Sequence, residues 1–191
     1  MNIPRSEMEE YNALLKHLVK KVNKTLGLND KNEYVLELCG SFRREKAFSN
    51  DIDVLISKKD TNYSSKTQNH LERFVNKLKS PMKHNDNKPL LIDSMTDQKI
   101  KTKYMGFSRY LDNPPRRIDI RFINYDSYPA AILYFTGSAT LNKKMREIAK
   151  KKGYKLSEYG LFDKDGRPIK VSSEHDIFHK LGMEYLVPRL R

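Results

Sequence analysis

Two aspartates separated by a single apolar residue constrain this chain more than any other feature of its sequence. Asp51 and Asp53 lie in DIDVLIS (51–57), where apolar residues alternate with polar ones in a way that predicts a β-strand. Side chains alternate along a strand, so the two carboxylates project from the same face. Carboxylates this close raise each other's pKa unless a cation neutralises them, and the usual cation is a divalent metal ion bound by oxygen ligands.

A third acidic position falls in RRIDIRF (116–122), where Asp119 lies between Ile118 and Ile120. We expect Asp119 on a strand of the same sheet, so that the three carboxylates meet on one face of an antiparallel sheet. Three carboxylates can bind two divalent ions, which clamp the attacking and leaving oxygens of a phosphoryl transfer. One aspartate on a strand is more often a surface residue and DxD alone is a weak signal, but the combination favours a metal site.

The residues before the acidic strand favour phosphate binding. Gly40 and Ser41 predict a tight turn whose backbone N–H groups and hydroxyl can face phosphate oxygens. Arg44 can add a forked, charge-assisted contact to the same group. Either Arg43 or Arg44 could instead be an ordinary surface charge, and their spacing alone does not separate the two roles.

Charge and cysteine content narrow the classes of partner and compartment. The 191 residues suffice for one domain or two small ones, and 37 Lys and Arg against 24 Asp and Glu give a net charge of +13. This excess fits a polyanion such as nucleic acid, although a solvated surface, an acidic membrane or an acidic protein would account for it equally well. A single cysteine, Cys39, excludes an internal disulfide and fits a reducing, intracellular compartment, without distinguishing cytoplasm, nucleus and virion. No apolar run reaches the length of a membrane span and the N-terminal segment has no signal-peptide core, so no membrane partner is expected.

Hydrophobic periodicity predicts helices and strands along most of the chain. The segment 6–22 is an amphipathic helix that begins with a capping box at Ser6 and Glu9. Strands are predicted at 34–39, 51–57, about 89–95, 99–107 and 116–124. A further helix is predicted at about 65–79, before a polar, poorly ordered loop at 80–88.

The pattern changes after residue 126. Two helices broken at Gly137–Ser138 come first, followed by a β-hairpin around the turn DKDG (163–166) and a short capped helix over 172–182. His175 and His179 are four residues apart on that helix, but no further ligands accompany them, so we expect surface positions rather than a metal site.

Several of these segments resemble those of a known family. CGSFRREKAFSNDIDVLI (39–56) resembles the signature of nucleotidyltransferases of the DNA polymerase beta superfamily. TKYMGF (102–107), RRIDIRF (116–122) and the segment 132–162 are similar to those of family X DNA polymerases, and the resemblance runs from about Ile3 to the C-terminus. It implies an α+β fold, with a nucleotidyltransferase palm of mixed or antiparallel sheet and helices at 1–126 and a small α+β thumb-type, nucleotide-binding domain at 127–191. It also implies the minimal two-domain type of some large DNA viruses, without lyase and helix-hairpin-helix domains.

The resemblance implies a role for each matching residue. Asp51 and Asp53 would bind two Mg²⁺ ions, which Mn²⁺ could replace, and Asp119 would bind only the catalytic ion beside the primer 3′-hydroxyl. The nucleotide-binding residues implied are Gly40, Ser41, Arg44, Asn50, Tyr134, Phe135, Gly137 and Asn142. The DNA-binding residues implied are Lys103, Arg117, Lys143 and Arg146. Without the resemblance, we would interpret the two aromatic residues as core and the basic residues of the second helix as a solvated face.

Two positions depart from the family pattern. Asn50 stands where relatives commonly have glycine, which bears on a backbone contact to the triphosphate. Ala139 replaces an acidic residue of some relatives and removes a side-chain contact near the base. Both departures concern nucleotide affinity and fidelity rather than the metal ligands.

The function implied is that of an enzyme, a template-directed DNA polymerase that fills short gaps in DNA repair by two-metal-ion transfer from a dNTP to a primer 3′-hydroxyl. Its expected partners are gapped or primed DNA, dNTP, and a DNA ligase or other repair proteins, with the chain acting as a monomer. One alternative is template-independent transfer to DNA 3′ ends, which Asn142 and Arg146 weakly oppose. A non-catalytic DNA-binding scaffold is opposed by the complete aspartate triad, and a small-molecule nucleotidyltransferase by the net charge and the helix pair.

Overall fold

A mixed sheet lies at the centre of the larger part of the molecule. The structure is a computed structural model that describes residues 2–66, 69–95 and 101–191. Its five-stranded sheet has the order β2-β4-β7-β6-β5. The strands are β2 (Tyr34–Leu38), β4 (Ile52–Lys58), β5 (Leu91–Ser94), β6 (Lys103–Ser108) and β7 (Arg116–Phe122). Together with the helices described next, they confirm the predicted α+β fold class.

One pairing in this sheet differs from the expectation. Strands β4 and β7 are parallel, whereas the other neighbours in the sheet are antiparallel. We expected the strands that carry the aspartates to be antiparallel, and this was wrong. Between the two strands the chain forms α3 (His70–Lys79), β5 and β6, so β7 enters the sheet from the same end as β4.

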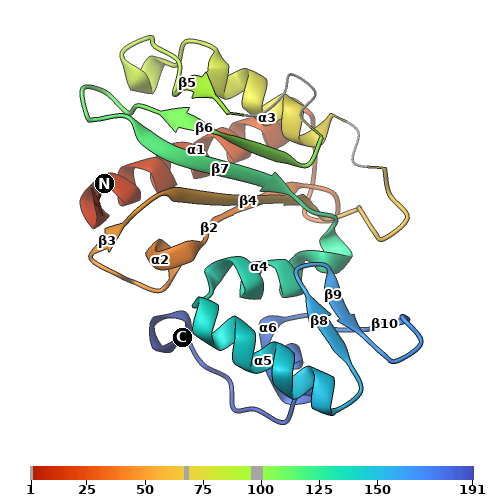
Figure 1. Ribbon diagram of the computed structural model, residues 1–191. Coiled ribbons are helices and arrows are strands. Elements are labelled where there is room, and N and C mark those ends of the chain that lie inside the picture. Colours follow the sequence, from red (N-terminus) through yellow and green to blue (C-terminus); the bar gives the residue numbers. More distant parts are fainter. Residues whose placement is uncertain (1, 67–68, 96–100) are drawn as a thin grey trace.

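Helices α1 (Arg5–Thr25) and α3 cover one face of the sheet (Figure 1). Their buried residues follow the helical period, and they pack against the alternate apolar residues of the strands. On β4 and β7 these residues are Ile52, Val54, Ile56, Ile118, Ile120 and Phe122. The predicted helix at 65–79 begins at His70, and positions 67–68 of that prediction lie outside the described residues, as do positions 99–100 of a predicted strand.

The predicted capping box of the first helix is wrong. Pro4 is the N-cap, no side chain caps the helix, and Ser6 lies inside the first turn. The reason is a short ladder just before the helix, because β1 (Ile3–Pro4) pairs with β3 (Phe48–Ser49). This pairing holds Pro4 extended and starts the helix at Arg5, one residue before Ser6.

The loop at 80–88 is more regular than predicted. It contains a 3₁₀ turn, η1 (Lys83–Asn85), and a β-bridge between Met82 and Lys88. The Asn85 side chain is buried, donates to three backbone carbonyls and accepts from the Leu111 amide. A single asparagine therefore provides the backbone partners that a helix or strand would otherwise supply.

The C-terminal elements lie on the other side of the sheet (Figure 1). They are η2 (Tyr125–Ser127), α4 (Tyr128–Thr136), α5 (Ala139–Lys151), β8 (Lys155–Ser157), β9 (Gly160–Phe162), β10 (Pro168–Ile169), α6 (Glu174–Lys180) and η3 (Pro188–Leu190). The break at Gly137–Ser138, the hairpin and the short helix α6 before Gly182 agree with the predictions, while pairing of β8 with β9 adds a third strand to the hairpin. These elements have a separate core, which includes Leu133, Met145, Leu161 and Phe178. No helix formed by the described residues is long and apolar enough to span a lipid bilayer.

Candidate active site

The register of β4 and β7 brings two of the predicted carboxylates together. Asp53 is the direct partner of Asp119 across the parallel ladder, and Asp51 immediately precedes β4. Side chains at matching register positions of neighbouring strands project from the same face. Because Ile52 and Ile118 face α1 and α3, the carboxylates project from the opposite face, toward α4.

The carboxylates influence each other's ionisation. Burial, and then the charge of Asp51, raises the pKa of Asp53 to about 6. Desolvation, and then the charge of Asp119, raises the pKa of Asp51 above its ordinary value. A bound cation would relieve both effects.

Two arginines on β7 partly neutralise the negative charge of Asp53 and Asp119. Arg121 Nη1 donates to Asp53 Oδ1 at 3.1 Å, and Arg117 Nη2 donates to Asp119 Oδ1 at 2.7 Å. Arg121 was missed by the sequence reasoning, although the strand period already places it two residues from Asp119, on the same face.

The acidic side chains do not converge on one point in this arrangement. Within residues 2–66, 69–95 and 101–191, no three acidic, histidine or cysteine side chains lie close enough together to ligate a single ion. The donor set nevertheless fits divalent ions such as Mg²⁺, because it offers hard carboxylate oxygens, and neighbouring acidic charge contributes to raising the pKa of Asp51 and Asp53. Asp53 could ligate such an ion through both oxygens only if Arg121 released Oδ1.

Gly40 and Ser41 lie directly beside the carboxylates. Gly40 begins the short helix α2 (Gly40–Arg43) with φ +59°, and a Cβ atom there would lie 3.3 Å from Asp53 Oδ2. Ser41 Oγ donates to Ser49 Oγ at 2.8 Å. Cys39, the residue before α2, donates from its amide to the carbonyl of Asp53 at 2.8 Å, so the turn and the acidic strand are held together.

The structure distinguishes the roles of Arg43 and Arg44, which the sequence alone did not. Arg43 makes a bidentate ion pair with Glu174 at 2.7 and 2.8 Å and also donates to Thr136 Oγ1. Arg44 Nη1 donates to the Thr136 carbonyl at 2.6 Å. The Arg44 Nε group is buried and has no partner among the described residues, so it remains a donor available to an anion. Arg43 therefore joins α2 to α6, and Arg44 is the arginine that can face a phosphate.

Glu174 is the centre of a half-buried ion cluster. It accepts hydrogen bonds from Arg43 and also from Arg191 Nη1 at 2.7 Å. Burial acts to raise its pKa, but the hydrogen bonds from Arg43 and Arg191 outweigh burial and hold the pKa below its ordinary value. This cluster connects the sheet region to the C-terminal elements.

The aromatic residues of α4 lie over the sheet. The Arg121 guanidinium lies 4.5 Å from the centroid of the Phe135 ring, and the Tyr134 and Phe135 rings meet edge to face at 5.1 Å. Asn142 Nδ2 donates to the Tyr134 carbonyl at 2.8 Å, which fixes α5 against the end of α4. A Cβ atom at Gly137, where φ is +74°, would lie 3.0 Å from Arg44 Nη1, so a larger residue would disturb the Arg44 contact.

A cavity of about 630 Å³ extends from these rings along the end of β7. Its lining includes Lys103, Arg121, Tyr134, Phe135, Glu158 and Tyr159. Asn50, Lys143 and Arg146 lie apart from it on exposed surfaces, with Asn50 just before Asp51 and the two basic residues on α5. Of the residues singled out in the sequence, those of the turn, the two strands and α4 are adjacent.

Comparisons with known proteins indicate the same family along nearly the whole chain. The family model described as DNA polymerase beta palm matches residues 2–125, and the model described as DNA polymerase beta thumb matches residues 131–191. A DNA polymerase lambda of Rattus norvegicus is 31% identical over 205 residues, which cover 99% of this chain and 33% of the relative. A DNA polymerase lambda of Arabidopsis thaliana is 30% identical over 207 residues, which cover 99% of the chain and 36% of the relative. A DNA nucleotidylexotransferase of Xenopus laevis is 27% identical over 212 residues, covering 97% and 40%. The chain thus spans between a third and two fifths of the length of these relatives.

Proposed function

The chain belongs to the DNA polymerase beta family (family X), and from this premise we propose that it is a template-directed DNA polymerase that fills short gaps. The reaction would join the α-phosphorus of a dNTP to a primer 3′-hydroxyl and release pyrophosphate. The palm would comprise residues 1–126 and the thumb residues 127–191. The observation that carries the proposal is the pairing of Asp53 with Asp119 across β4 and β7, with Asp51 one residue before β4.

The three aspartates would hold two divalent ions, and bound Mg²⁺ or Mn²⁺ would supply stabilisation of the charge on the attacking and leaving oxygens. Asp119, whose Oδ1 accepts from Arg117, would take the proton of the primer hydroxyl. Arg117 would thereby orient the carboxylate as well as contact the primer end. Arg121 would have to release Oδ1 of Asp53 for that carboxylate to bind an ion through both oxygens.

The nucleotide would lie between α2 and α4. Gly40, Ser41 and Arg44 would bind its phosphates, and the buried, unpaired Nε of Arg44 supports this role. The Tyr134–Gly137 backbone would enclose the sugar, Asn50 would contact the triphosphate, and Asn142 would reach the minor-groove edge of the new base pair. The exposed cations Lys103, Lys143 and Arg146 would contact the primer and template strands.

A second candidate is template-independent addition to DNA 3′ ends. The similarity to a DNA nucleotidylexotransferase favours it, although at 27% identity. The two candidates differ in whether the exposed cations of α5 read a template strand. As part of the gap-filling proposal, we also propose that the chain acts as a monomer. It would cooperate with a DNA ligase or other repair proteins in a reducing compartment.

Primer extension tests the proposal. We expect nucleotide addition to gapped DNA and, more weakly, to recessed ends, each dependent on Mg²⁺ or Mn²⁺, and little addition to single strands. Efficient addition to single strands with no preference for the nucleotide opposite a template base would support the second candidate. Specific DNA binding without any addition, with both ions, would support the non-catalytic scaffold.

A further inference from the structure

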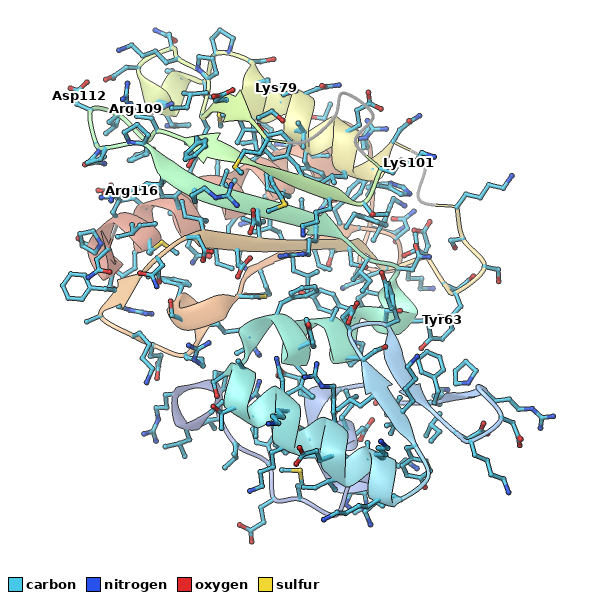
Figure 2. All side chains as sticks on the ribbon, viewed as in Figure 1. Tyr63, Lys79, Lys101, Arg109, Asp112 and Arg116 are labelled. Carbon is cyan, nitrogen blue, oxygen red and sulfur yellow. The ribbon has the colours of Figure 1, made fainter. Side chains whose placement is uncertain are left out.

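Tyr63 connects the loop after β4 with the segment that leads into α4. Its backbone amide donates to Asp126 Oδ2 at 3.2 Å, and its hydroxyl donates to the Asp126 carbonyl at 3.3 Å. Asp126 belongs to η2, directly before α4 begins at Tyr128. Figure 2 shows Tyr63 at the outer edge of this junction, beside β9.

The same side chain also contacts the thumb. The Tyr63 ring lies 6.3 Å from the Phe162 ring of β9, centroid to centroid. A Cβ atom built on Gly160 would lie 2.9 Å from Tyr63 Oη, closer than such atoms approach in proteins. The phenol therefore lies against the backbone of β9 at the buried Gly160, where an added Cβ would require Tyr63 to shift.

Helix α4 is held at its opposite end by the palm arginines. Arg44 binds the Thr136 carbonyl, and Arg43 binds the Thr136 hydroxyl and Glu174. Between the two ends, the apolar contact of α4 with the sheet is small and consists mainly of Ala131 and Ile132 against Cys39, Leu55 and Ile123. A helix of this length spans about 13 Å, so a displacement of the Asp126 end, with the Thr136 end held, would turn the helix about that end and change the direction in which Tyr134 and Phe135 project.

We propose that Tyr63 is a positioning residue that sets the tilt of α4, and with it the place of Tyr134 and of Phe135, whose ring stacks on Arg121. The expected kinetic effect rests on the proposed function, whereas the expected change in geometry does not depend on it. Tyr63 is 43% exposed, so it contributes little buried area, while its hydrogen bonds hold the Asp126 segment before α4 and its ring contacts Phe162 of the thumb. Its removal should therefore change the orientation of the thumb more than the stability of either part.

Kinetics on gapped DNA provide the first test, with Tyr63→Ala compared with the parent. We expect KM for the dNTP to rise about threefold to tenfold, with kcat and DNA affinity within about twofold, since binding geometry rather than chemistry is disturbed. Tyr63→Phe keeps the ring contact and should lie between them. Leu26→Ala, at a palm position that is 41% exposed, serves as the matched control and should leave KM unchanged. An unchanged KM in Tyr63→Ala would overturn the kinetic part.

A distance measurement provides a readout that needs no activity. Cys39 is buried, so spin labels can be attached to cysteines introduced at the exposed positions Asn76 on α3 and Lys150 on α5. We expect Tyr63→Ala to shift or broaden the distance distribution between the labels, and Leu26→Ala to leave it unchanged. If the parent adds no nucleotides, the proposed function fails while this measurement still decides the role of Tyr63. Superimposable distributions would overturn the proposal.

The Gly160 contact allows a double-mutant test of the same geometry. Gly160→Ala should shift the distances by forcing the new Cβ against the Tyr63 hydroxyl. Adding Tyr63→Phe removes that oxygen and should restore part of the parent distribution. The rescue should be partial for two reasons. The φ of +156° at Gly160 strains any residue with a Cβ, and the added Cβ would also lie 3.2 Å from the Phe162 ring. Strictly additive effects of the two substitutions would show that the contact does not position the thumb.

Discussion

The two faces of the palm sheet are built from the same strands and have opposite characters. The face toward α1 and α3 is mainly apolar, with a buried Arg116–Glu7 ion pair at the start of β7, and holds the main core. The face toward α4 carries Asp53, Asp119, Arg117 and Arg121, with only a small apolar cluster beside them. Because strand residues alternate, β4 and β7 can stabilise the fold with one set of side chains and leave the other set for charge. The comparison teaches that the candidate site can be altered without loss of the core, and the core without change of the site's chemistry.

Removal of one carboxylate from the charged face should produce the largest effect on activity and almost none on stability. Asp119→Asn should lower nucleotide addition by about a thousandfold or more, because the proposed metal ligand and proton acceptor would be lost. Its free energy of unfolding should stay within about 1 kcal/mol of the parent value, since the core face is untouched. Primer extension and urea unfolding measure the two quantities. Retained extension would contradict the assignment of Asp119, and strong destabilisation would contradict the separation of the faces.

A truncation on the apolar face should have the reverse effect. Ile120→Ala, at a residue with 0% exposure, should lower the free energy of unfolding by about 2–5 kcal/mol. The matched change Ile132→Ala, in the small cluster between α4 and the sheet, should lower the free energy of unfolding by less. Ile132 is 9% exposed, so the site can relax. Urea unfolding of both variants provides the comparison. Equal losses would mean that α4 is packed as firmly as the main core.

Arg146, an exposed cation of α5, tests whether the C-terminal elements read a template. Arg146→Ala should lower insertion of the correct nucleotide about tenfold to hundredfold, the loss of one charge-assisted contact. Insertion of a wrong nucleotide should fall less, because a mismatched pair already fits poorly, and addition to a single strand should hardly change. Steady-state insertion of all four nucleotides opposite one template base measures this. Equal losses on templated and untemplated ends would assign Arg146 to general DNA binding.

The smallest expected effect concerns the ion cluster that joins the two parts of the molecule. The folded pKa of Glu174 lies below its usual value of 4.5, so the ionised carboxylate stabilises the folded state. This contribution is complete above about pH 4.5 and is lost as the pH falls through the folded pKa. Glu174→Gln should therefore reduce stability by about 1–2 kcal/mol at pH 7 and flatten the loss of stability in acid. Urea unfolding from pH 7 to pH 3 compares the two proteins, and identical pH profiles would count against the cluster.

The alternation of residues made both faces of the sheet predictable. The alternation at positions 52–54 places the Asp53 carboxylate on one face and the core residues Ile52 and Val54 on the other. The helix break at Gly137 was equally predictable from the sequence. The parallel pairing of β4 and β7 could not be read in this way, because local alternation carries no information on strand direction.

Contacts between distant residues were also beyond the sequence. Arg43 and Glu174 are 131 positions apart, and Tyr63 and Asp126 are 63 apart, so neither pairing follows from local pattern. The capping box failed for a related reason, since pairing of Pro4 with Phe48 sets the start of α1. In each case a tertiary contact decided what propensity alone left open.

The parallel central pair has a consequence for the order of folding. β4 ends at Lys58 and β7 begins at Arg116, so the two strands can join only after the chain between them has been made and brought back. Contacts of such sequence separation slow folding, because the entropy of closing the loop is lost before the contact forms. We therefore expect Asp53 and Asp119 to meet in a late folding step, whereas the β2–β4 hairpin can form early. A nascent chain that has not yet reached β7 would have half of its carboxylate pair and an unpaired central strand edge, and this edge would be the segment most exposed to aggregation during synthesis.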